Sequence, residues 1–398
     1  MKIGIIIDTI SPFYIGGYET RAYELARRLA SQHDVTVFTS APAPQWLEGI
    51  AVRNIRPQAE TFDSNGFRKP IESIRFAAAV LALTSRPLDL DIIDCNATPF
   101  VHIAAAKMVA RRNGVPLVVT AHEALAENLS SFVNRGHRWT RPAQRMLLRK
   151  LYSAGHDAAD HVIATSELAR TGLLNEGVRN VSVTHGGVSE IGVAKRRYRG
   201  RIGTVGRLVP IKRTSVIINA FGDLIRLGLA QHLTIVGAGP ERSSLEELAR
   251  SLGLQSRVRF YGAVDDDERD RILKDEIDVF VSASPREGLS IATLEAMAAG
   301  NPCVVTSVPE CGSNGALEYV RHGQNGQVCN GTSASLVDAV RSTALSDDVY
   351  CSLSTHAVET ARRYTWDGAA KELLTIYSAV IESSQTSKGG QRSPLVVT

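Results

Sequence analysis

Two glutamates and two cations follow apolar runs in the second half of the chain. Glu287 and Glu295 are separated by seven residues, most of which are good helix formers. Arg207 and Lys212 follow an earlier apolar run. A guanidinium and an ammonium so placed can neutralise a diphosphate, and the free amides of a helix start can bind the same anion. Because carboxylates accept hydrogen bonds from ribose and sugar hydroxyls, we expect one ligand that carries both groups.

The two glutamates are also compatible with an ordinary solvated helix face. Glu295, however, lies among Ala, Met and Leu residues, where a half-buried carboxylate needs a partner. If the helix begins near Leu289, Glu287 lies at its start and Glu295 lies inside it. The two side chains would then reach different parts of one ligand.

His122 stands two positions after the apolar run 117–120. A lone histidine is usually a hydrogen-bonded or solvated loop residue. Its position just past the carboxyl end of a predicted strand favours a functional role instead.

A basic segment extends from Arg135 to Lys150 and contains no acidic residue. Its cations alternate with Trp, Met and Leu side chains, so it can bind an anionic membrane surface or an anionic acceptor. The same pattern also fits a solvated helix whose apolar residues pack into the core. Both interpretations stay open.

Strand-like apolar runs alternate with helical patterns along the chain, as in doubly wound parallel sheets. The run 3–7 leads through a Gly-rich loop to a helix and a second run at 35–39. Periodicity is weak at 187–200, which we interpret as a linker, and a new series begins at Arg201. We therefore expect an α/β protein with two Rossmann-like domains that face each other across a cleft. The expected parts are a first domain at 1–190, a second domain at 191–365, a helix at 366–382 that returns to the first domain, and a disordered tail at 383–398.

Composition limits the function classes. The 398 residues are 44% hydrophobic and 22% charged, which is typical of a soluble protein of about two domains. The net charge of +4 does not indicate a nucleic-acid partner. Five cysteines without a Cys-x-x-Cys pair favour a reducing compartment and no structural zinc. Since the first apolar run is too short for a signal peptide and no later run approaches a membrane span, we expect a cytoplasmic protein.

Two common nucleotide-binding motifs are absent. The Gly237-x-Gly239 sequence lacks the third glycine of a dinucleotide site, because Arg242 stands there. No Walker sequence is present. The acidic run 265–267 is predicted to cap the helix that follows it rather than to hold a metal. We therefore predict no metal site and no cofactor.

Taken together, the motifs resemble the retaining glycosyltransferases of family 4, which have the GT-B fold. Glu287 and Glu295 match the Glu-x7-Glu motif of that family, and residues 206–212 match its Gly-Arg-Leu-x-x-x-Lys segment. The resemblance covers the chain to about Ile381. Further matches in the order of the family are Gly16-Gly17-Tyr18-Glu19, Thr120-Ala121-His122, Ile235-Val236-Gly237-Ala238-Gly239-Pro240, Phe260-Tyr261-Gly262-Ala263-Val264 and Asn325-Gly326.

The resemblance implies transfer of a sugar from a nucleotide-diphosphate sugar to a hydroxyl acceptor with retention of anomeric configuration. The acceptor would be a sugar or a lipid-linked sugar, in glycan, lipid-linked sugar or polysaccharide synthesis. By matched position, Arg207 and Lys212 would bind the diphosphate, Glu295 the ribose and Glu287 the donor sugar. The other matched positions would place the amides of Gly288, Leu289 and Ser290 on the anion, Gly17 near the phosphates, Gly262 and Val264 beside the base, and His122 opposite the donor sugar.

The chain departs from the family pattern at two places. His185-Gly186-Gly187-Val188-Ser189 replaces the usual Asn-Gly-Val-Asp, so no contact is carried over there. Ser290 replaces a common glycine, and its hydroxyl could contact a phosphate. The alternatives are a GT-B nucleotide-sugar epimerase or sugar phosphorylase and a non-catalytic nucleotide-sugar-binding subunit. Retention of Glu287 together with the two cations argues against the non-catalytic alternative.

Overall fold

The computed structural model of the chain describes residues 1–14, 16–56, 61, 69–123, 146, 150, 152, 155–311 and 314–388. These residues form two compact units. The first contains the described residues up to Gly186 together with the helix that begins at Trp366, and the second contains Gly187–Thr365. The first unit is therefore discontinuous in sequence. Apart from Met146 and Lys150, the basic segment Arg135–Lys150 lies outside the described residues.

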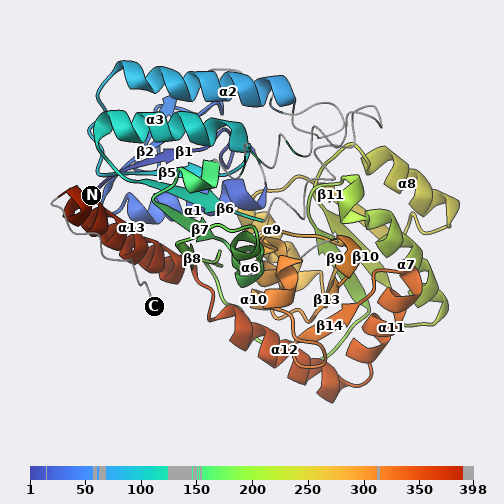
Figure 1. Ribbon diagram of the computed structural model, residues 1–398. Coiled ribbons are helices and arrows are strands. Elements are labelled where there is room, and N and C mark those ends of the chain that lie inside the picture. Colours follow the sequence, from blue (N-terminus) through green and yellow to red (C-terminus); the bar gives the residue numbers. More distant parts are fainter. Residues whose placement is uncertain are drawn as a thin grey trace. The chain divides into compact units, whose positions relative to one another are not determined.

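A largely parallel sheet forms the centre of the first unit (Figure 1). Its order among the described residues is β3-β4-β2-β1-β5-β6-β7-β8, and the β3–β4 pair is antiparallel. Since β1 pairs with β2 on one side and β5 on the other, the winding direction reverses at β1. The strands are β1 (Lys2–Ile6), β2 (Asp34–Thr39), β3 (Trp46–Leu47), β4 (Ile50–Asn54), β5 (Ile92–Asn96), β6 (Leu117–Ala121), β7 (His161–Ala164) and β8 (Val181–Val183).

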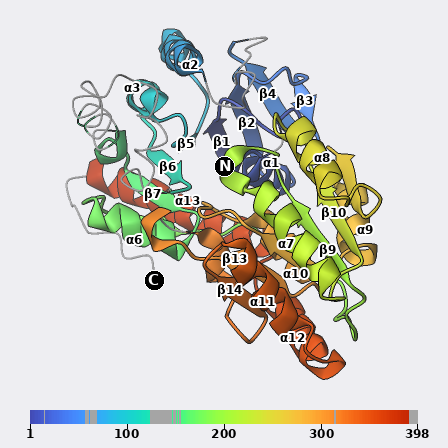
Figure 2. The same ribbon diagram turned by 90° about the vertical axis from the view of Figure 1, so that its right-hand side faces the viewer.

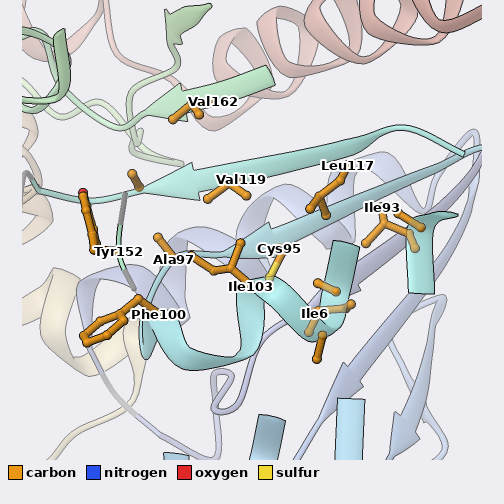
Figure 3. Packing of buried hydrophobic residues seen from close by; sticks show 14 of the residues in the cluster. Ile6, Ile93, Cys95, Ala97, Phe100, Ile103, Leu117, Val119, Tyr152 and Val162 are labelled. Atoms are coloured by element: carbon orange, nitrogen blue, oxygen red, sulfur yellow. The ribbon is translucent and has the colours of Figure 1, made fainter. Parts of the chain in front are cut away.

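Helices cover both faces of this sheet (Figure 1). Helices α2 and α3 pack against each other, and α1 packs against α13. Between the sheet and α3, side chains such as Cys95, Val119 and Ile103 form a fully buried core (Figure 3). The helices are α1 (Gly17–Leu29), α2 (Pro70–Ala82), η1 (Leu83–Ser85), η2 (Phe100–His102), α3 (Ile103–Asn113), α6 (Glu167–Asn175) and α13 (Trp366–Lys388).

Helix α13 belongs to the first unit through both surface and core contacts. At its start, the Arg28 Nε donates to the Asp367 carboxylate at 2.7 Å. In the core, the Tyr377 hydroxyl donates to Asp94, which also accepts a hydrogen bond from Thr120 Oγ1 at 2.8 Å. Burial raises the pKa of the Asp94 carboxyl, and these hydrogen bonds partly offset that shift.

The disordered tail expected from residue 383 differs from the structure, because α13 continues to Lys388. The Thr386 hydroxyl bonds the main-chain carbonyls of Glu382 and Ser383. Extending an existing helix needs no new nucleation, so a polar sequence can continue one that packing has already formed. Residues 389–398 lie outside the described residues.

The second unit contains a parallel sheet, of which β9, β10, β13 and β14 are labelled in Figure 2. Its order among the described residues is β11-β10-β9-β12-β13-β14. Here β9 pairs with β10 on one side and β12 on the other, so the winding direction reverses at β9. The strands are β9 (Arg201–Val205), β10 (His232–Val236), β11 (Val258–Gly262), β12 (Val279–Ser282), β13 (Cys303–Thr306) and β14 (Gly326–Cys329).

Two helical layers enclose this second sheet (Figure 1). Helix α7 packs between α8 and α11 in one layer, and α10 packs between α9 and α12 in the other. No helix in the described part of the chain is both long and apolar enough to cross a bilayer. The helices are η3 (Pro210–Lys212), α7 (Thr214–Arg226), α8 (Arg242–Ser251), α9 (Asp266–Asp275), α10 (Ile291–Ala298), η4 (Pro309–Cys311), η5 (Gly315–Glu318), α11 (Ser333–Thr343) and α12 (Asp347–Ala361).

The segment interpreted as a linker, 187–200, is packed onto the second unit. The amide of Gly192 donates to the Ala298 carbonyl at 2.8 Å, and the amide of Lys195 donates to Ser354 Oγ at 2.7 Å. The Lys195 ammonium reaches Asn301 Oδ1 at 2.6 Å. Weak periodicity at 187–200 therefore reflects an irregular but anchored segment.

Candidate functional site

A pocket opens at the carboxyl ends of β9 and β12, where the strand order of the second unit reverses. Ligands of open α/β sheets bind at this kind of position, because the connections on its two sides diverge to opposite faces. We name it the β9–β12 pocket. Its lining residues are Thr204, Val205, Gly206, Arg207, Leu208, Lys212, Thr214, Phe280, Ser282, Glu287, Ser290 and Ala292.

The loop after β9 rests on the turn after β10. Gly206 and Leu208 donate main-chain hydrogen bonds to carbonyls of residues 236–239, each at 2.9 Å. A Cβ at Gly237 would lie 1.9 Å from the Gly206 carbonyl oxygen, and one at Gly239 would lie 2.3 Å from the Leu208 carbonyl oxygen. The Gly-x-Gly sequence at 237–239 thus lets two loops approach closely. Leu208 is buried, which anchors the loop and leaves the neighbouring Arg207 exposed at the pocket.

Lys212 and Glu287 meet in this pocket. Lys212 Nζ donates to Glu287 Oε1 at 2.5 Å, with side-chain exposures of 27% and 12% respectively. Lys212 follows β9 and Glu287 follows β12, so the two neighbouring strand ends bring together residues 75 positions apart. The pocket therefore contains a partly buried ion pair beside the exposed cation of Arg207.

The main chain at Glu287 is held from a neighbouring loop. The amide of Gly315 donates to the Glu287 carbonyl at 2.8 Å, and a Cβ at Gly315 would lie 2.2 Å from the Gly288 carbonyl oxygen. The Asn314 amide group donates to the carbonyls of Ser284 and Thr306 at 3.0 and 2.9 Å. These contacts hold the main chain of the loop that carries Glu287. No local sequence signal pointed to Asn314, because its partners are distant in sequence.

Helix α10 begins at Ile291, slightly later than expected. Ser290 lines the pocket, and its hydroxyl lies 2.7 Å from the hydroxyl of the fully buried Thr293. Gly288 and Leu289 precede the helix in the loop that holds Glu287. The amides at this start are directed along the axis of an eight-residue helix, which favours an anion at its amino end.

Glu295 lies inside α10 and has a cationic partner. Arg269 of α9 contacts Glu295 Oε1 at 3.1 Å, and it also pairs with Asp266 at 2.5 Å and Asp270 at 3.4 Å. Burial alone would lower the pKa of the Arg269 guanidinium, but the carboxylates, Glu295 foremost, raise it instead. Sequence reasoning predicted that Glu295 needs a partner but did not find Arg269, which stands in a charged helix that looks merely solvated.

Gly262 and Val264, which were predicted to lie beside the base, stand at and just after the end of β11. Gly262 has a φ of +79° and accepts a hydrogen bond from the amide of Gly237 at 2.7 Å. Val264 stands two positions later, and the side chain of the next residue, Asp265, accepts a hydrogen bond from the amide of Glu268 at 2.9 Å. The predicted cap on the next helix is confirmed at Asp265.

Gly17 and His122 belong to the first unit. Gly17 is the first residue of α1. His122 follows β6 and lies against the Tyr18 ring, with ring centroids 5.4 Å apart. Removal from water and the nearby Arg21 guanidinium lower the pKa of His122 to about 3. His122 is therefore neutral near pH 7, so it can exchange hydrogen bonds but contributes no charge.

Comparison with known proteins decides the family. Residues 15–190 match the model for Glycosyltransferase Family 4, and residues 194–363 match the model for Glycosyl transferases group 1. The chain belongs to these glycosyltransferases. The predicted membership in the glycosyltransferases is thereby confirmed, and the retaining mechanism stays a prediction.

Curated relatives match this glycosyltransferase over most of its length. An uncharacterized glycosyltransferase of Methanocaldococcus jannaschii is 26% identical, with 96% of this chain and 99% of the relative covered. A D-inositol 3-phosphate glycosyltransferase of a Nocardioides species is 28% identical over 91% of this chain and 85% of the relative.

Solved structures show the fold. Sucrose-phosphate synthase from Thermosynechococcus elongatus superposes with a TM-score of 0.76 at 18% identity, covering 96% of this chain and 99% of that chain. Anabaena Alr3699/HepE, crystallised with UDP and glucose, has a TM-score of 0.71 at 20% identity and coverages of 95% and 100%. The predicted GT-B class with two Rossmann-like domains is confirmed.

Proposed function

We propose that this glycosyltransferase moves a sugar from a nucleotide-diphosphate sugar to a hydroxyl acceptor with retention of anomeric configuration. The observation that carries the proposal is the β9–β12 pocket, in which Arg207, Lys212 and Glu287 line one hollow at the strand switch point. Two cations suit a diphosphate, and a carboxylate beside them suits the hydroxyls of an attached sugar. The crystallisation of HepE with UDP and glucose makes UDP-glucose the first donor to test.

In the proposed reaction, the bond between the anomeric carbon and the diphosphate oxygen breaks, and a bond from that carbon to the acceptor oxygen forms on the same face. The acceptor proton passes to the departing phosphate. Negative charge grows on the diphosphate as the first bond lengthens. Arg207, Lys212 and the amides before α10 therefore stabilise the transition state more than the bound donor.

The remaining roles follow the matched positions. Glu295 would accept hydrogen bonds from the ribose, with Arg269 holding its carboxylate in place. Gly262 and Val264 would border the base. Of the residues of the first unit, Gly17 would lie near the phosphates and the neutral His122 would face the donor sugar. We also propose that the two cations compensate the diphosphate charge without a metal.

The test is to incubate the full chain with UDP- and GDP-sugars and a panel of sugar and lipid-linked acceptors, with and without EDTA. We expect EDTA-insensitive transfer from one donor class and an unchanged anomeric configuration by NMR. Inversion would refute the retaining mechanism, and loss of activity in EDTA would refute metal independence. Formation of only an epimer or a sugar phosphate would instead support the alternative enzyme classes.

We further propose a cytoplasmic enzyme that contacts anionic lipid through Arg135–Lys150. All five cysteines are free, which supports a reducing compartment. For the lipid contact, we expect co-sedimentation with phosphatidylserine vesicles at low salt and its loss at high salt, because salt screens exposed charges. Replacing Arg138, Arg141 and Arg145 by Gln should abolish sedimentation at low salt. Vesicle binding unaffected by this change would contradict the assignment.

A further inference from the structure

Glu287 is the acidic side chain among the described residues that line the β9–β12 pocket. Its carboxylate is 12% exposed and accepts a hydrogen bond from Lys212 Nζ at 2.5 Å. The amide of Gly315 holds its main-chain carbonyl at 2.8 Å, so the carboxylate can leave the cation only by rotation of its own side chain. Any anion that binds Lys212 must therefore share the ammonium with Glu287 or displace it.

We propose that Glu287 makes this site discriminate by charge between a nucleotide sugar and the free nucleoside diphosphate. The inference rests on the proposed function, because it assumes that the diphosphate lies on Arg207 and Lys212. It adds a specificity role for Glu287 that contact with the sugar hydroxyls alone does not require.

The two ligands differ in charge at the phosphate nearest the sugar. In a nucleotide sugar this phosphate has an ester bond to the sugar and an anhydride bond to the neighbouring phosphate, so it carries one negative charge. After transfer it is the terminal phosphate of the diphosphate, whose second proton leaves with a pKa of about 6, so near pH 7 it carries almost two charges. The sugar hydroxyls, which could donate to Glu287, have left with the acceptor.

Several groups in the pocket attract the additional charge of the product. Arg207, Lys212 and the amides before α10 all favour the more highly charged free diphosphate. Glu287 opposes them, because a carboxylate close to a phosphate dianion repels it and solvent screens this repulsion weakly in a partly buried site. A Lys ammonium has three donors, so it can hold Glu287 and a singly charged phosphate together. Glu287 thus favours the intact donor and assists product release.

The experiment measures the affinities of UDP and UDP-glucose, and of GDP and GDP-mannose, for the full chain by calorimetry without acceptor. In Glu287→Gln we expect the free diphosphate to gain about 10-fold in affinity relative to the nucleotide sugar, because one like-charge repulsion is lost. The Gln amide keeps the size of the side chain and can still accept hydrogen bonds from the sugar. Glu287→Asp, which retains the charge, should keep most of the wild-type preference.

Glu295→Gln is the matched control. It removes the same charge, but Glu295 is paired with Arg269 and assigned to the ribose, which both ligands contain. We therefore expect Glu295→Gln to weaken both ligands alike and to leave their affinity ratio unchanged. Melting temperatures of the variants report whether each is folded.

The possible outcomes separate the two proposals. If neither nucleotide pair binds the wild-type chain, the proposed function fails and the charge discrimination fails with it. If a pair binds but Glu287→Gln leaves the affinity ratio unchanged, or shifts it no more than Glu295→Gln does, the proposed function stands and the charge discrimination is overturned. A shift specific to Glu287→Gln supports both.

Discussion

Replacing Lys212 by Met is expected to lower kcat for sugar transfer by about 10² to 10³-fold, which is typical for removal of one fixed group that stabilises developing charge. Lys212 is the cation paired with Glu287 in the β9–β12 pocket. Methionine keeps much of the length and apolar surface of the lysine stem while removing its ammonium. Because the charge on the diphosphate increases during bond breaking, kcat should fall more than the affinity for the donor. Steady-state kinetics with the donor identified by the screen measures both values.

Arg213→Met provides the control for this prediction. Arg213 is adjacent in sequence, but its guanidinium lies against Gly331 and it does not line the described pocket. The same change of side chain should leave kcat within about twofold, as expected for a substitution outside the site. If Lys212→Met and Arg213→Met have equal effects on kcat, Lys212 has no special role in the reaction.

The second large effect is expected for Gly237→Ala, which should lower the free energy of unfolding by about 3 kcal/mol or more. The new Cβ would lie 1.9 Å from the Gly206 carbonyl oxygen, and Gly237 has a φ of +132°. Both the loop after β9 and the turn after β10 would have to shift. Urea unfolding followed by far-UV circular dichroism gives the change in midpoint.

Gly228→Ala is the control that separates the cost of backbone strain from the cost of the steric clash at Gly237. Gly228 has a φ of +69°, but a Cβ there would meet nothing within 4 Å. We expect it to cost only about 1 kcal/mol, from the left-handed conformation alone. Equal destabilisation by the two variants would show that the close approach to Gly206 is unimportant. Since the loop after β9 carries Arg207, Gly237→Ala should also reduce activity in the protein that remains folded.

Both sheets were predictable from the sequence because strands buried on both faces form continuous apolar runs separated by helical patterns. The runs 3–7 and 35–39 became β1 and β2, and the series that began at Arg201 became the second sheet. The return of the chain at Trp366 to the first unit has no such local basis in composition or periodicity. It depends on contacts such as that between Tyr377 and Asp94, whose partners are 283 positions apart.

The candidate site was predictable in its residue types but not in its pairings. Glu287, Glu295, Arg207 and Lys212 were identified because charged residues after apolar runs collect at one edge of a parallel sheet. That Lys212 contacts Glu287, while Arg269 contacts Glu295, depends on the order of strands and the packing of α9 against α10. The spacing of these residues along the sequence gives neither the strand order nor the helix packing.

The glycines at 237 and 239 show a further limit on predicting a binding site from the sequence. A Gly-x-Gly after a strand suggests a phosphate cradle, and the missing third glycine argued only against a dinucleotide. The structure assigns these glycines to loop-on-loop packing, through the carbonyls of Gly206 and Leu208. The same residue type can thus serve the neighbouring loop rather than a ligand, and only the neighbour's position distinguishes the two uses.

The discontinuity of the first unit has a consequence for biosynthesis. On the ribosome, Gly187–Thr365 emerges before the helix that completes the first unit, so the second unit can fold while the first still lacks α13. Until Tyr377 arrives, the Asp94 carboxylate lacks one of its hydrogen-bond donors and α1 lacks its helical neighbour. A nascent chain stalled within the second unit would therefore expose apolar surface on its first one, the condition in which chaperones bind.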